Sequence, residues 1–114
     1  MLIIIRKAST FYSKISLSDN HKNPVVLSQG DQLIFTVRKN YDDDQSPPLI
    51  RKVIRYDEQI EGGYPFVLTP EETNLPAGTY YYDVGLQCQN GEFYHITMAE
   101  QFVVNESISR KEST

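Results

Sequence analysis

The sequence predicts an all-β sandwich of about seven to nine short antiparallel strands with one short helical turn. Three observations lead to this prediction. Apolar and polar residues alternate with a period of two through most of the chain. Residues that favour turns (Gly, Pro, Asn and Asp) separate these alternating runs. No long segment repeats its apolar residues at the 3.6-residue period of an amphipathic helix.

The alternating runs give the expected strands in chain order. They are Leu2–Arg6, Tyr12–Leu17, Pro24–Leu27, the run DQLIFTVRK, Leu49–Arg55, Tyr64–Leu68, the run TYYYDVGLQC and the run FYHITMAEQFVV. In the fourth run Leu33, Phe35 and Val37 share one face, and in the seventh Tyr80 and Tyr82 do. These faces are expected to form the core, because side chains two residues apart point the same way along a strand.

Prolines, a turn and an interruption shape these strands. Pro24 and Pro65 lack the N–H that an inner strand must donate, so both segments are expected at sheet edges or strand starts. Asn90-Gly91 separates the last two runs and favours a hairpin closed by a type I′ turn, which needs positive φ at both positions. Ala99-Glu100-Gln101 breaks the last run, where we expect a bulge.

The segment that begins at Thr69 has the pattern of a helix start. Thr69 can cap, Pro70 suits the first helical position, and Glu72 can complete a capping box. Pro76 then prevents the helix from continuing. We therefore expect one helical turn that carries the chain from one sheet to the other.

The segment from Leu75 to Tyr80, LPAGTY, resembles the tyrosine corner of immunoglobulin-like and fibronectin-like sandwiches. In that corner a Tyr near the start of strand F bonds back to the preceding backbone. The resemblance makes Tyr80 the corner residue, with Leu75 in the core and Gly78 supplying permissive backbone. The predicted fold is therefore an immunoglobulin-like β-sandwich.

Three longer stretches resemble small β-sandwich domains of bacteriophage tails, in particular the amino-terminal domain of phage baseplate upper proteins. The stretches are LSQGDQLIFTVRK, FVLTPEETNLPAGTYYYDVGLQCQNGEFYHIT and EQFVV. The matching positions are Gly30-Asp31, Leu68 to Thr73, Gly78 to Asp83, Asn90-Gly91 and Phe102 to Val104. The resemblance implies structural work in a virion or prophage, with other phage structural proteins as partners and no catalysis. It also implies location in the virion, and in the host cytoplasm during assembly.

The length suits one domain, since 114 residues can bury one core without disulfides or metals. We expect the sandwich to occupy residues 1–104 and residues 105–114 to form a polar, flexible tail. The apolar start is shorter than the core of a signal peptide, and no stretch approaches the length of a membrane span. A membrane partner is therefore not expected.

The charge and the reactive residues exclude several classes of function. A net charge of -4 argues against a nucleic-acid partner. The single cysteine, Cys88, excludes an internal disulfide and shares parity with core residues, so we expect a buried structural thiol. No motif of a catalytic nucleophile, a zinc site or a phosphate-binding loop is present. The protein is therefore expected to be no enzyme and to need no cofactor or metal.

Two functions remain. The first is an assembly module that docks on other phage proteins, and possibly on itself, through Leu2, Ile3, Ile4 and Ile5 and the outward-facing Tyr81. The second is a carbohydrate-binding module. Its site would be a loop of Tyr41, Asp42, Asp43 and Asp44, which could alternatively hold a cation and is most simply a solvated acidic loop.

Overall fold

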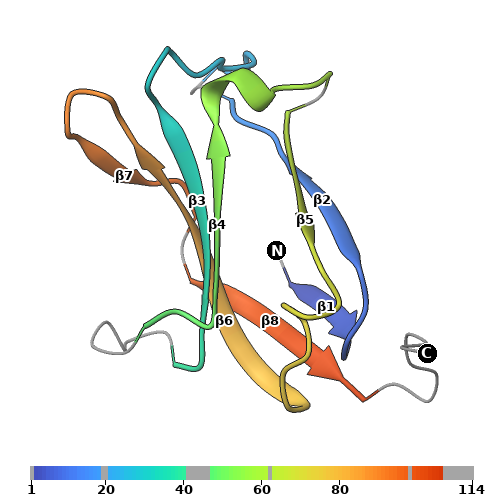
Figure 1. The fold of residues 1–114 in the computed structure, drawn as a ribbon. Helices are drawn as coiled ribbons and strands as arrows, with labels where there is room; N and C mark the ends of the chain where they lie inside the picture. Colours follow the sequence, from blue (N-terminus) through green and yellow to red (C-terminus); the bar gives the residue numbers. More distant parts are fainter. Residues whose placement is uncertain (1, 19–20, 41–46, 62, 98, 107–114) are drawn as a thin grey trace.

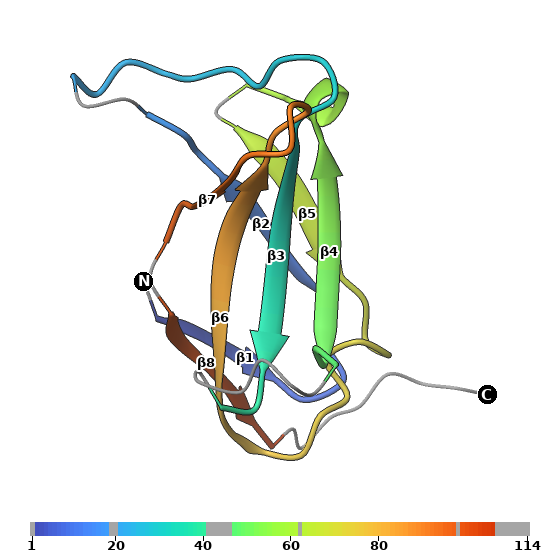
Figure 2. The same ribbon diagram turned by 90° about the vertical axis from the view of Figure 1, so that its left-hand side faces the viewer.

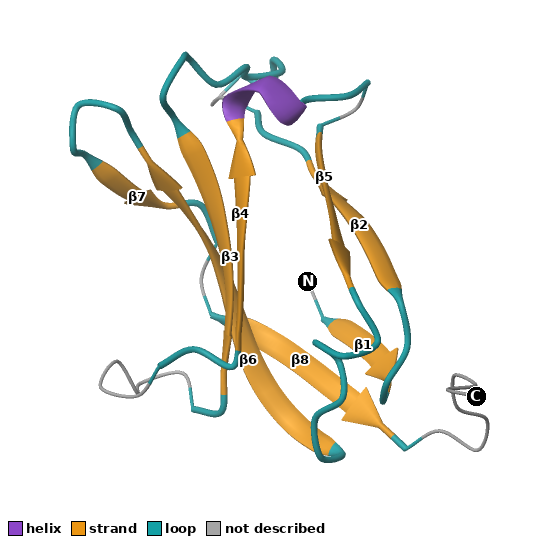
Figure 3. Ribbon diagram, viewed as in Figure 1, coloured by secondary structure: helices purple, strands orange, loops and turns teal. Residues whose placement is uncertain are grey.

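The computed structural model describes residues 2–18, 21–40, 47–61, 63–97 and 99–106, and it is a two-layer β-sandwich (Figure 1). The strands are β1 (Ile3–Arg6), β2 (Phe11–Ile15), β3 (Gln32–Arg38), β4 (Ile50–Arg55), β5 (Tyr64–Leu68), β6 (Gly78–Gln87), β7 (Phe93–His95) and β8 (Glu100–Asn105). A short 3-10 helix, η1 (Tyr56–Glu58), follows β4. Strands dominate the regular structure, as Figure 3 shows, and the prediction of an all-β fold is confirmed.

The two layers have unequal widths. One sheet has the order β1-β8-β6-β3-β4, with β7 pairing with β6 as a sixth strand, and the other contains β2 and β5. Figure 2 shows the large sheet in front of the small one. An immunoglobulin sandwich has the sheet order A-B-E-D opposite C-F-G, and β2 and β5 correspond to B and E. The fold is therefore an immunoglobulin-like sandwich whose second sheet, within the described residues, keeps only its two inner strands.

The core lies between the inner faces of the two sheets. Leu33, Phe35 and Val37 of β3 are almost completely buried, as their shared parity predicted. Tyr80 and Tyr82 of β6 point to the same core. The ring of Phe35 packs against Phe66, Tyr82 and Phe102 at centroid distances of 4.7, 5.3 and 6.3 Å, so one aromatic cluster joins the layers.

Two strand predictions were wrong. β1 pairs with β8 in parallel, with Ile3 opposite Phe102, so not all strands are antiparallel. Pro24–Leu27 is not a strand: Pro24 forms one isolated bridge with Ser18, and the Leu27 N–H donates to the hydroxyl of Tyr64 at 2.7 Å. Leu27 is buried because of that tertiary contact, which local alternation cannot reveal.

The interruption of the last run is real but lies earlier than predicted. β6 pairs with β7 as far as His95 and with β8 from Glu100, so the ladder is broken between these residues. There the Val84 N–H donates to the side-chain Oγ1 of Thr97 at 3.0 Å, and the Ile96 N–H donates to the Val84 carbonyl at 2.8 Å. At the break, the Thr97 hydroxyl oxygen thus takes the place of the backbone carbonyl that would accept from the Val84 N–H in a continuous ladder.

The hairpin between β6 and β7 has a different turn from the predicted type I′. The Gly91 N–H donates to the carbonyl of Cys88 at 3.0 Å, and Gly91 has φ of 94° while Asn90 does not have positive φ. This is a three-residue loop, in which a type I turn is followed by a left-handed glycine. Asn-Gly suits both loops, so the sequence alone could not decide between them.

The last strand ends close to Val104, where we expect the sandwich to end. β8 ends at Asn105, one residue beyond the predicted end, because the Lys7 N–H donates to the Asn105 carbonyl at 2.8 Å. Most of the expected tail, residues 107–114, lies outside the described residues.

Candidate functional site

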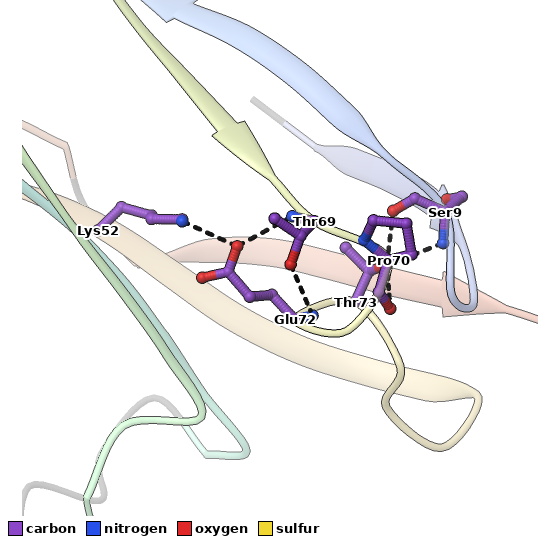
Figure 4. A network of polar contacts seen from close by, with 6 residues as sticks. All are labelled: Ser9, Lys52, Thr69, Pro70, Glu72 and Thr73. Carbon is purple, nitrogen blue, oxygen red and sulfur yellow. Dashed lines mark hydrogen bonds and ion pairs between the residues drawn. The ribbon is translucent and has the colours of Figure 1, made fainter. Parts of the chain in front are cut away.

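The two sheets are tied together on the side where β4 and β5 lie, which we call the closed side. The predicted capping box is present in the turn after β5: the Thr69 N–H donates to Glu72 at 2.9 Å, and the Glu72 N–H donates to the Thr69 hydroxyl at 3.2 Å (Figure 4). One turn forms, closed by a bond from the Thr73 N–H to the Thr69 carbonyl. The chain then enters β6, so the turn crosses between sheets as expected.

Thr73 fixes this turn to the β1–β2 connection. Its side chain is fully buried, and its Oγ1 accepts a bond from the Ser9 N–H at 2.9 Å and donates one to the Ser9 carbonyl at 2.6 Å. The Ala8 N–H also donates to the Thr73 carbonyl. Figure 4 shows Ser9 and Thr73 facing each other across this contact. A buried hydroxyl with satisfied bonds stabilises the join between segments 64 residues apart.

A salt bridge closes the same side. Lys52 shares the inner parity of Ile50 and Ile54 on β4, and its Nζ reaches Glu72 at 2.8 Å (Figure 4). Burial raises the pKa of the Glu72 carboxyl, but the Lys52 ammonium and the Thr69 N–H lower it, and the balance is a pKa below the ordinary 4.5. The charged carboxylate is therefore favoured in the folded protein.

The predicted tyrosine corner is present. The Tyr80 hydroxyl donates to the Pro76 carbonyl at 2.6 Å, and Leu75 packs against the core from the same loop. The Tyr80 side chain is 3% exposed, and burial raises the pKa of its phenol. The Lys39 ammonium lies 4.7 Å from the ring centroid, a favourable cation–π distance.

The Gly30-Asp31 pair anchors the β6–β7 hairpin. The carboxylate of Asp31 accepts bonds from the N–H groups of Ser28 and Gln89, both at 3.0 Å. The side chain of Gln89 lies so close to Gly30 that an added Cβ would be only 2.7 Å from its Cγ. Cys88 beside it is half-buried, less so than expected, and burial with the charges of Asp31 and Glu92 raises the pKa of its thiol. That direction is opposite to the one that makes a reactive thiolate.

The opposite side of the sandwich, between β1 and β2, is open. A groove of about 410 Å³ runs along β2 from Phe11 to Ile15 and on to Ser16, and on its other side lie Ile4 of β1 and Leu2, which precedes β1. Its floor includes Phe35, Tyr82 and Val84 of the large sheet and Phe66 of β5. A second hollow of about 450 Å³ adjoins it at Ser16 and Thr97 and is lined by Leu17, Val25 and Ile96. Apolar side chains are thus accessible along one whole side of the domain.

The structure divides the residues predicted for the interface. Leu2 and Ile4 are 50% and 56% exposed on the open side, as an interface requires. Ile5 was wrongly assigned to it, because Ile5 is 5% exposed and belongs to the core, and Ile3 packs partly against that core. Tyr81 does point away from Tyr80, but it is half-buried and lies on the outer face of β6, with β8 between that strand and β1.

The residues predicted for the alternative sugar or cation loop, Tyr41, Asp42, Asp43 and Asp44, lie outside the described residues. Within the described ranges, no group of three His, Cys, Asp or Glu side chains could hold a metal ion. No helix among them is long and apolar enough to cross a membrane.

The groove residues of β2 were missed by the sequence-based prediction. The sequence predicts a strand over Tyr12–Leu17, which leaves out Phe11, whereas β2 spans Phe11–Ile15 with Phe11, Ser13 and Ile15 on its half-buried face. Their accessibility results from the narrowness of the second sheet, which no local pattern encodes. A weak signal was available: Pro65 marks β5 as an edge strand, and β2 carries no proline.

Comparisons with known proteins do not identify a family. No family model matches the chain, and no curated protein does either. A solved structure from photo-crosslinking analyses of multimeric cell-adhesive interactions of VGSC beta subunits is similar at 13% sequence identity. The match covers 96% of this chain and 93% of that chain with a TM-score of 0.39, too weak a likeness to carry a conclusion.

Proposed function

We propose that this protein is a non-enzymatic structural or assembly protein of a bacteriophage or prophage, a module of the tail or baseplate that binds other virion proteins. The observation that carries the proposal is the open side. The side chain of Leu2 is about half exposed and that of Ile4 more than half exposed, and both lie beside an apolar groove of about 410 Å³. Large contiguous apolar surface is typical of a protein-binding site.

The phage assignment is supported by the sequence resemblance. Several of its matching positions have clear structural reasons here: Gly30-Asp31 anchors the hairpin, Thr69 and Glu72 cap the turn, and Tyr80 closes the corner. The virion, reached from the host cytoplasm during assembly, is the location that this proposal requires.

The test is reconstitution with the products of the genes that flank this one. Each is co-expressed with the protein, and complexes are measured by size-exclusion chromatography with light scattering. We expect a stable complex with a tail or baseplate protein, and loss of that complex when Ile4 is changed to Asp while the domain stays folded. Neighbouring genes for enzymes that act on glycosides, together with retention on a polysaccharide column and no protein complex, would replace the proposal by the carbohydrate-binding one.

A further inference from the structure

The free edge of β2 is the most unusual feature of the open side. In the immunoglobulin arrangement, strand A lies beside B, which corresponds to β2. Here β1 pairs with β8 of the other sheet, so within the described chain the only strand beside β2 is β5. The groove runs along the opposite edge of β2, where strand A would lie.

The backbone groups on that edge can be assigned from Pro65. In an antiparallel pair, residues alternate between exchanging both backbone bonds and exchanging none. Pro65 stands opposite Lys14 and has no N–H, and the Ile15 carbonyl oxygen lies against the backbone of Gly63 on the β5 side. Ile15 therefore bonds to β5, and the N–H and C=O groups of Tyr12 and Lys14 point into the groove side. No other described residue forms a backbone bond with these groups.

We propose that the open side accepts an extended segment of another virion protein, which pairs with the free edge of β2 and takes the place of strand A. This inference rests on the proposed function and names the way in which the partner binds. A strand supplies N–H and C=O groups at the spacing of those of Tyr12 and Lys14. Its alternate side chains enter the groove between Phe11, Ile15 and Val84, so they must be apolar.

Lys14 defines the charge of the segment. It is exposed and is the one charged residue among those that line the groove, with its Nζ bonded to the Glu61 carbonyl at 3.2 Å. A residue opposite Lys14 on an added strand shares its outward face, so an acidic side chain there is favoured and a basic one is repelled. The partner segment therefore alternates apolar residues with polar ones and carries a Glu or Asp.

A second copy of this chain cannot supply its own β2 as the added strand. The groove face of its β2 is already occupied, because Phe11 packs against Phe66 and the core beneath it. A second β2 would bring its own large sheet into the space that the groove offers to side chains alone. The occupant must be a strand with no second layer behind it, such as a terminal segment or a loop of the partner.

The experiment uses a synthetic capped peptide of about nine residues that alternates valine with threonine and carries one glutamate in place of the central threonine. A control peptide has the same composition with its valines consecutive. Amide hydrogen exchange of the full chain is followed by NMR with and without each peptide. We expect the amides of Tyr12 and Lys14 to exchange at least about tenfold more slowly with the alternating peptide, and no change with the control.

Two variants separate edge pairing from simple contact. Lys14→Pro removes the N–H on the free edge and no bond to β5, whereas Lys14→Ala removes only the charged side chain. We expect Lys14→Pro to weaken peptide binding at least about tenfold relative to Lys14→Ala, and Lys14→Ala to weaken it only a few-fold, the effect of one exposed ion pair. Thermal unfolding establishes that both variants are folded. The exchange measurement is made on the wild type, so it tests the proposal even if a variant does not fold.

Unchanged exchange at Tyr12 and Lys14 with saturating peptide would overturn the inference, as would equal binding by the two variants. Dimers of the free protein that are lost in Lys14→Pro would overturn the choice of partner. A flanking tail protein that binds Lys14→Pro as tightly as the wild type would refute strand addition and leave the proposed function standing. Peptide protection without any virion partner would support the strand site and refute the virion role.

Discussion

The closed and the open side of this sandwich differ in two respects: how many of their polar groups are hydrogen-bonded, and how well their apolar side chains are buried. On the closed side, Lys52 joins the two layers by pairing with Glu72, and in the β5–β6 connection that carries Glu72, Thr73 and Tyr80 are buried with bonded hydroxyls. On the open side, Leu2 and Ile4 face an apolar groove. The edge of the small sheet at β5 is thus bonded to the rest of the domain, whereas apolar side chains of the core are accessible at its other edge, along β2.

The edges of the small sheet show the same contrast. β5 carries Pro65, whose missing N–H lies on its outer edge and prevents a further strand from pairing fully there. β2 has no proline, and under the proposal made above its Lys14 selects an acidic partner strand. The difference teaches that the two outer edges of one two-stranded sheet need not be alike: Pro65 hinders pairing on the edge of β5, while the edge of β2 keeps its N–H groups.

The largest expected effect compares two neighbours in β1. Ile5→Ala removes a core side chain that is 5% exposed, and we expect it to lower the free energy of unfolding by about 2–5 kcal/mol. Ile4→Ala removes one that is 56% exposed, and we expect a loss below about 0.5 kcal/mol. Urea unfolding measures both. Equal losses would mean that Ile4 is covered in the free protein and that the side is not open.

Thr73→Val tests the join between the β5–β6 turn and the β1–β2 connection, because it keeps the shape of the side chain and removes its hydroxyl. The Ser9 N–H and carbonyl then lose their partner, and we expect a loss of about 1–3 kcal/mol in urea unfolding. Ser9→Ala is the control, since it removes a hydroxyl that donates to the Arg6 carbonyl in an exposed contact and leaves the backbone groups of Ser9 bonded to Thr73. A Thr73→Val variant as stable as Ser9→Ala would show that the hydrogen bonds between Thr73 and Ser9 add no stability to the fold.

Tyr80→Phe tests the corner at a smaller scale. It leaves the Pro76 carbonyl without its bond from the phenol, and we expect thermal unfolding to show a loss of about 1 kcal/mol. Tyr12→Phe alters a tyrosine that is 58% exposed on the small sheet and should cost less than about 0.5 kcal/mol. The reverse order would contradict the contrast between the two sides.

The pH dependence of the salt bridge is the smallest effect. Because the folded pKa of Glu72 is below 4.5, its ionised form adds stability above that pH, and this contribution disappears as the pH falls through the folded pKa. Glu72→Gln keeps an acceptor for the Thr69 N–H and removes the charge, so we expect it to cost about 0.5 kcal/mol at neutral pH and less below pH 4. A difference from the wild type that is constant with pH would exclude the Lys52 pairing as its source.

The sequence predicted the connection from β5 to β6 far better than it predicted the open side. The corner, the capping box and the sheet crossing depend on residues within about a dozen positions of one another, and local signals such as Thr69, Pro76 and Tyr80 describe them. The parallel pairing of β1 with β8 joins the two ends of the chain, and alternation is the same in both directions. The groove depends on how many strands cover the large sheet, which is a property of the whole topology.

Native-state hydrogen exchange of the free protein tests the central claim most directly. The N–H of Ser13 bonds to β5 in the pairing inferred from Pro65, while those of Tyr12 and Lys14 face the open side. We predict that the amides of Tyr12 and Lys14 exchange at least about tenfold faster than that of Ser13 between them, in a fully folded sample. Equal and strong protection of all three would show that the edge of β2 is already paired and would contradict the account.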